Sequence, residues 1–137
     1  MRRRNSPCAS ANRRAVAASE LAVCLPVIVL LVLAMIESCT MIFLKQSLTV
    51  AAYEGVRTAL EPNAVEANVQ ASSTDVLTDR RFQQARVVVT PANFHTLAPG
   101  EYITVTVSAP ADRNSVLPGK FFRGRTLTAS ATMMKEF

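Results

Sequence analysis

The chain has 137 residues, a formal net charge of +5 and 50% hydrophobic residues, but no Trp. All of the excess positive charge comes from five arginines within residues 1–14, while the rest of the chain holds equal numbers of basic and acidic side chains. A nucleic-acid-binding domain needs a basic cluster on its folded surface, so this distribution argues against nucleic acid as a partner. The length allows one small folded core in addition to a membrane segment.

The N-terminal half combines a basic leader with a long apolar helix. Residues 1–15 are expected to form the leader and residues 16–60 the helix. Within it, residues 21–44 are mostly apolar with Glu37 as their one charged residue, and at about 1.5 Å per residue they extend for about 36 Å. That length crosses a hydrocarbon core of about 30 Å with some tilt. Pro26 predicts a kink, which membrane helices tolerate.

The arginines also predict the direction of insertion. Positively charged flanks stay in the cytoplasm, so the N-terminus is expected inside and the C-terminal domain outside the plasma (inner) membrane. A cleaved secretory signal is the competing interpretation, but the apolar run is longer than a typical signal core and no small-x-small site follows it. The three cysteines are Cys8, Cys24 and Cys39, so the outer domain has no disulfide framework.

The upper part of the helix carries small residues on one face. Ala52, Gly55 and Ala59 recur at helical spacing, which lets another element approach the backbone closely. We therefore interpret these three residues as helix-packing positions. Pro62 is expected to end the helix near Leu60, because the residue before a proline avoids the α region.

Residues 61–137 predict a small extracytoplasmic α+β domain packed on the upper helix. The tetrad at 63–66, Asn-Ala-Val-Glu, resembles a capping box that opens a short helix. A loop is expected at 71–74, followed by further helical turns over 75–84. Alternation of apolar and polar residues then predicts three antiparallel strands at 86–90, 102–108 and 125–134. Such a sheet needs a cover for its apolar face, and the long helix is the candidate.

Catalytic signatures are lacking. His95 is the one histidine, and the sequence has neither a nucleophile elbow nor a Gly-rich phosphate loop. The chain is therefore expected not to be an enzyme and to need no cofactor or metal.

Several blocks of sequence resemble the TadE-like pseudopilins of tight-adherence pilus systems. Residues 13–22, RRAVAASELA, precede the apolar run and are similar to the family's start, in which a basic residue, a glycine and four small residues precede a glutamate. The pair Ile36-Glu37 and the block AAYEGVR at 51–57 are similar to family blocks at the same places. Residues 104–110 and 127–133 resemble the family's C-terminal strands.

The resemblance implies a minor pilin-like component that anchors or primes filament assembly. Its implied partners are membrane lipid, a prepilin-type peptidase, other pilin-like subunits and pilus assembly proteins. Cleavage would fall between Ala15 and Val16, which makes Glu20 the fifth residue of the mature chain. The family usually has Gly where this chain has Ala15. An unprocessed, membrane-anchored adaptor domain is therefore the alternative.

Each of the two helix glutamates has two interpretations. Glu20 either pairs with the new α-amino group of Val16, on its own or a neighbouring chain, or lies among headgroups near the arginines. Glu37 either contacts a partner helix or extends its carboxylate to the outer headgroups.

Overall fold

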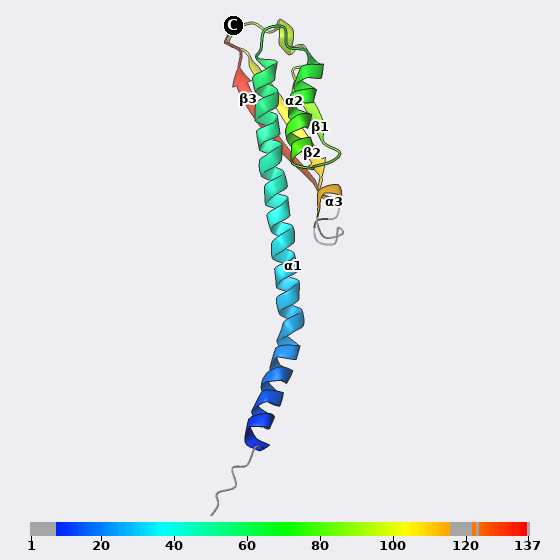
Figure 1. Ribbon diagram of the computed structural model, residues 1–137. Coiled ribbons are helices and arrows are strands. Elements are labelled where there is room, and N and C mark those ends of the chain that lie inside the picture. The colour runs from blue at the N-terminus through cyan, green and yellow to red at the C-terminus, as the bar shows by residue number, and fades with distance from the viewer. Residues whose placement is uncertain (1–7, 116–121, 123, 137) are drawn as a thin grey trace, which may run out of the picture. The chain divides into compact units, whose positions relative to one another are not determined.

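The computed structural model describes residues 8–115, 122 and 124–136. The chain divides into two compact units, Met1–Ile36 and Glu37–Phe137. Helix α1 (Cys8–Ala59) contributes to both units (Figure 1). It begins before the start expected at residue 16, because the stretch from Cys8 to Leu25 contains neither proline nor glycine and is rich in alanine, the best helix former.

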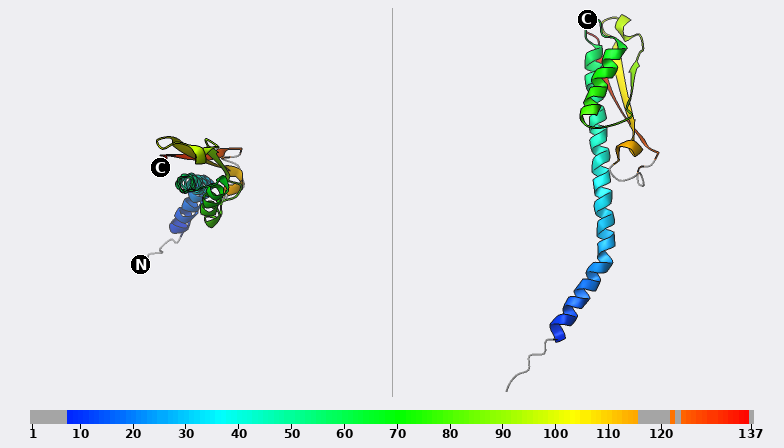
Figure 2. Two further views of the ribbon diagram at one scale, coloured as in Figure 1. Left: turned by 90° about the horizontal axis from the view of Figure 1, so that it is seen from above. Right: turned by 45° about the vertical axis from the view of Figure 1, so that its right-hand side comes forward.

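Pro26 lies inside α1 without ending it. Figure 2 shows that α1 bends within its blue, N-terminal portion, to which Pro26 belongs. A proline inside a helix removes one backbone hydrogen bond and crowds the preceding turn, which is the usual cause of such a bend.

The second unit is an α+β domain, as the sequence predicts. Its helices besides α1 are α2 (Glu66–Asp79) and the short α3 (Ala111–Asn114), and a 3-10 turn, η1, spans Phe94–Thr96. Three antiparallel strands form the sheet in the order β1-β2-β3: β1 (Arg86–Thr90), β2 (Tyr102–Pro110) and β3 (Thr126–Met134). In the register of the sheet, Val105 of β2 lies opposite Val89 on one side and Ala131 on the other.

Helix α2 differs from its prediction in two ways. Val65 is the residue before the helix and makes no side-chain cap, while Asn63 has φ of 64°, so the capping box is absent. The loop expected at 71–74 is helical. Val69, Ser73 and Leu77 repeat every fourth residue and are buried, so packing of this face outweighs the weak helix propensity of the Ser-Ser-Thr run.

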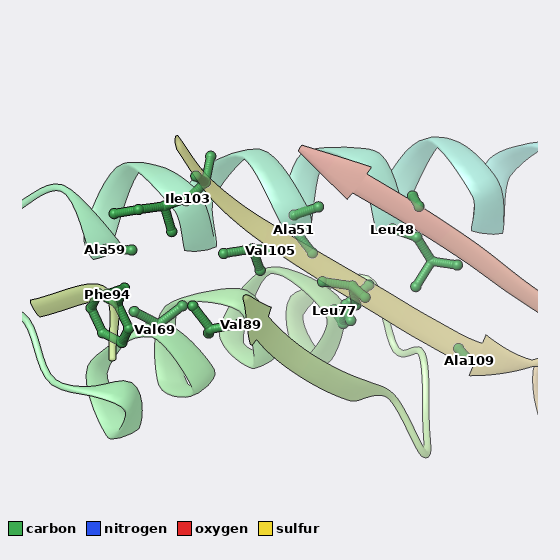
Figure 3. Close-up of a cluster of buried hydrophobic side chains, with 14 of the residues drawn as sticks. Leu48, Ala51, Ala59, Val69, Leu77, Val89, Phe94, Ile103, Val105 and Ala109 are labelled. Carbon is green, nitrogen blue, oxygen red and sulfur yellow. The ribbon is translucent and has the colours of Figure 1, made fainter. Parts of the chain in front are cut away.

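The core of the domain lies between the sheet and the two longer helices. Ile103, Val105 and Val107 on β2 are fully buried, and α1 contributes Leu48 and Ala51 opposite them. Figure 3 shows side chains from α1, α2 and the strands converging on this space. Burial of these apolar side chains is the main favourable term in the stability of the domain.

Candidate assembly site

The N-terminal part of α1 presents an uncovered apolar surface. Every residue from 13 to 32 is exposed in this single chain. Among the described residues, α1 is the one helix that is long and apolar enough to cross a membrane. The stretch 16–36 extends for about 31 Å, close to the hydrocarbon thickness. An apolar surface of this size needs lipid or other helices as its surroundings.

The expected processing site lies inside this helix. The peptide bond between Ala15 and Val16 belongs to α1, and the hydroxyl of Ser19 donates a hydrogen bond of 2.7 Å to the carbonyl oxygen of Val16. A peptide bond held in a helix is open to a peptidase only when the helix unwinds locally. Processing at this bond would therefore require opening of the surrounding turns.

Glu20 is exposed four residues further along the same helix. Within the described part of the chain, the structure gives its carboxylate no ion pair, and the nearby Arg13 and Arg14 are exposed as well. A charge placed in hydrocarbon costs about 2.5–3.5 kcal/mol on insertion scales. The carboxylate is thus available to a positive partner outside the described residues.

Glu37 lies inside the second unit rather than on an open helix face. Its side chain is fully buried, and the hydroxyl of Ser115 donates a hydrogen bond of 3.3 Å to its Oε1. Its Oε2 has no hydrogen-bond partner among the residues that the structure describes. Both interpretations from the sequence placed this carboxylate on the helix surface, and the structure places it against the chain's own domain.

The small-residue stripe also faces the domain. Ala52 is fully buried, Ala59 is 5% exposed, and both belong to the core cluster. A Cβ atom on Gly55 would lie 2.2 Å from Ser73 Oγ and 3.1 Å from Val105 Cγ1. The stripe therefore lets α1 approach α2 and β2 within the same chain.

The same helix carries the similarity to known proteins. The family model described as TadE-like protein matches residues 15–57. Over these residues of the helix the chain is similar to the TadE-like family. The TadE-like segment covers Ala15, Glu20, Glu37 and Gly55, whereas the sheet lies outside it. No curated protein and no solved structure matches the chain. The TadE-like match supports a component associated with tight-adherence pili and anchored in a membrane.

Sequence reasoning missed the partner of the buried carboxylate in this TadE-like segment. Ser115 is 78 residues away from Glu37 along the chain. It follows α3, a four-residue helix that the sequence did not predict. No local sequence pattern around either residue predicts their contact, because the position of Ser115 is set by the path of β2 and α3.

Proposed function

We propose that this TadE-like protein is a minor pilin-like subunit that anchors or primes filament assembly in a tight-adherence pilus system, and that it has no catalytic activity of its own. The observation that carries the proposal is the uncovered apolar helix with the exposed carboxylate of Glu20 close to its start. A helix of this kind can remain in lipid or pack against like helices, and the two environments are similar in polarity.

The proposed location is the inner membrane, with the N-terminus in the cytoplasm and the domain outside. Support comes from the five arginines of residues 1–14, which precede the apolar surface, against Lys45 and Arg57 on the helix beyond it. The domain then lies on the side where a filament grows.

In the proposed mechanism, a prepilin-type peptidase removes the leader before Val16. The new α-amino group of Val16 pairs with Glu20 of its own or a neighbouring subunit. Because a lone charge in hydrocarbon is unfavourable, a pair completed on assembly would favour one axial register between packed helices. The remaining leader-free helix would join other pilin-like subunits.

The second candidate is an uncut, membrane-anchored adaptor domain that holds pilus assembly proteins outside the membrane. Two observations favour it. Ala15 stands where the family usually has glycine, and the bond after it lies in a helix that is supported by the hydrogen bond between Ser19 and Val16.

N-terminal sequencing of the full chain, extracted from membranes with detergent, separates the two candidates. A mature start at Val16 supports the pilin-like subunit, and an intact arginine-rich leader supports the adaptor. Recovery of the chain in the aqueous fraction without detergent would contradict both.

The role of Glu20 is tested by cross-linking in cells. The Glu20→Ala variant should lose complexes with pilin-like subunits, while Glu61→Ala, which removes an exposed carboxylate from the outer domain, should keep them. Equal recovery of complexes from the Glu20→Ala variant and the unmodified chain would show that the charge pair is not used.

A further inference from the structure

Charged side chains are segregated between the two ends of the second unit. At the end where α1 enters the domain, six cations come together from five different elements and their flanks; we call this set the basic collar: Lys45, Arg80, Arg81, Arg86, Arg113 and Arg125. At the opposite end, acidic residues predominate, with only two described cations among them: Glu54, Glu61, Glu66, Glu101 and Glu136, with Arg57 and Lys135.

Hydrogen bonds place the collar residues at one end. The guanidinium of Arg80 donates a hydrogen bond of 3.0 Å to Ser47 Oγ on α1, and Lys45 Nζ donates to the carbonyl oxygen of Thr128 near the start of β3. On the other side, the backbone N–H of Ala111 at the start of α3 donates to the carbonyl oxygen of Arg125, at 2.8 Å.

Further contacts complete this end. Arg86 begins β1 opposite Ser108 in the last part of β2, which leads into α3. Gln83, two residues after Arg81, donates its backbone N–H to Asn114 Oδ1 at 2.8 Å. Figure 1 shows α3 and the C-terminal end of α2 at the same end of the sheet.

Carboxylates at this end neutralise the collar only in part. Of the described ones, Glu37 is buried, and Asp112 accepts the backbone N–H of Gly124 with both oxygens at 3.0 Å. Asp79 is exposed, and Asp75 lies one turn further up α2. The six cations of the collar outnumber these four described carboxylates, so positive charge is in excess at this end.

The collar lies where the apolar part of α1 ends. Ile42 and Phe43, three and two residues before Lys45, are 58% and 48% exposed. The Arg80 guanidinium lies 5.9 Å from the centre of the Phe43 ring, and the Phe43 and Phe82 rings are 5.6 Å apart. Apolar rings next to cations at the end of a membrane-spanning stretch match the change from hydrocarbon to headgroup.

We propose that the basic collar binds the headgroups of anionic phospholipids in the outer leaflet of the membrane that holds α1. Basic residues near a membrane surface attract anionic lipid, and the attraction falls off within about one Debye length. Because the collar lies at the end of the domain where the helix leaves the apolar region, the contact holds the base of the domain at the lipid surface. This inference requires only the membrane anchor and does not depend on processing or on pilin-like assembly.

The test uses the full chain reconstituted in nanodiscs of phosphatidylcholine alone or with about 30 mol % phosphatidylglycerol, an anionic fraction sufficient for such attraction. Amide hydrogen exchange is followed in α3 and in the last turn of α2. With the anionic lipid, exchange there should slow by about fivefold or more, the effect of roughly one surface cation. The slowing should disappear at about 0.5 M NaCl, because salt screens it.

Charge variants assign the effect to the collar. The triple variant Arg81→Gln/Arg113→Gln/Arg125→Gln removes exposed cations and should exchange at the same rate in both discs. The matched control Arg57→Gln/Lys135→Gln removes the cations of the opposite end and should retain the lipid effect. Unchanged exchange in β2 establishes that each variant keeps its fold.

Four results would overturn the proposal. The first is equal exchange in the two discs, and the second is a lipid effect that survives in the triple variant. The third is the same slowing when soluble glycerol phosphate is added to phosphatidylcholine discs. The fourth is loss of the lipid effect in a Glu61→Gln/Glu66→Gln variant. The third result would identify a free phosphate compound as the ligand, and the fourth would identify the acidic end of a second copy.

Discussion

The hydroxyl of Ser115 and the carboxylate of Glu37 are joined by a hydrogen bond of 3.3 Å, although 78 residues separate them. Glu37 is the first residue of the second unit on α1, and Ser115 directly follows α3. Their contact therefore ties the chain after β2 to the helix at the point where the domain begins. The remaining oxygen of Glu37 is buried without a described partner, so loss of the Ser115 donor would leave the carboxylate less satisfied still.

Loss of that donor should destabilise the domain. Ser115→Ala leaves the buried carboxylate without its described donor, and we expect the free energy of unfolding to fall by about 1–3 kcal/mol. Circular dichroism of the full chain in detergent, during urea unfolding, measures the change. Ser130→Ala on the exposed face of β3 is the control and should stay within about 0.5 kcal/mol of the unmodified chain. Similar losses in both variants would show that the contact with Glu37 is not responsible.

Replacement of Gly55 by alanine should lower the free energy of unfolding, although the same change usually stabilises a helix. Gly→Ala inside a helix normally gains about 1 kcal/mol. Here the new Cβ would lie 2.2 Å from Ser73 Oγ, so overpacking should lower the free energy of unfolding by about 1–3 kcal/mol. The same unfolding measurement applies.

Ser73 supplies the matched test of that clash. Its Oγ is buried without a hydrogen-bond partner in the described residues, so Ser73→Ala alone should not destabilise the domain. In the double variant Gly55→Ala/Ser73→Ala, part of the loss should be recovered. A gain in stability from Gly55→Ala alone would mean that α1 and α2 have more room than their contact indicates.

Asn114 should be the most sensitive polar residue near α3. Its amide nitrogen donates to the carbonyl oxygens of Gln83 and Pro110, and its Oδ1 accepts from Gln83 N–H. Asn114→Asp removes both donors, with an expected loss of about 1–3 kcal/mol for each unpaired carbonyl. Asn68→Asp, at an exposed place in the first turn of α2, should be neutral or slightly stabilising. If thermal unfolding shifts equally in the two variants, the Asn114 contacts do not hold this connection.

Processing should respond to the residue before the expected cut. Ala15→Gly restores the family's usual residue and also weakens the helix by about 1 kcal/mol, so a larger fraction of the chain should begin at Val16. N-terminal sequencing of membrane-extracted protein measures that fraction.

The control Ala17→Gly loosens the same helix and leaves the residue before the cut unchanged. An increase with Ala15→Gly alone indicates that the peptidase selects glycine. An equal increase with both variants indicates that unwinding of α1 limits processing, and no cleavage in either variant would support the uncut adaptor.

Local patterns predicted the regular elements well. Alternation along 102–108 gave a strand whose Ile103, Val105 and Val107 are all buried, and the three predicted strands are present in one antiparallel sheet. These features depend on neighbours close in sequence, which periodicity can detect.

Features set by distant contacts were not predicted. Residues 71–74 look like a loop in isolation, yet burial of Ser73 against Gly55 keeps them helical. The burial of Glu37 depends on Ser115, and the basic collar combines residues as far apart as Lys45 and Arg125. Residues 37–137 hold ten basic and nine acidic side chains, so a net charge of +1 counted along the sequence does not reveal the segregation that folding produces.

Helix α1 supplies Leu44, Leu48, Ala51 and Val56 to the core of the domain as well as the apolar surface before it. The upper part of α1 is therefore part of the domain, and a fragment that begins after residue 44 would lose part of its own interior. A water-soluble derivative should instead keep the whole helix and exchange its outward apolar side chains for polar ones.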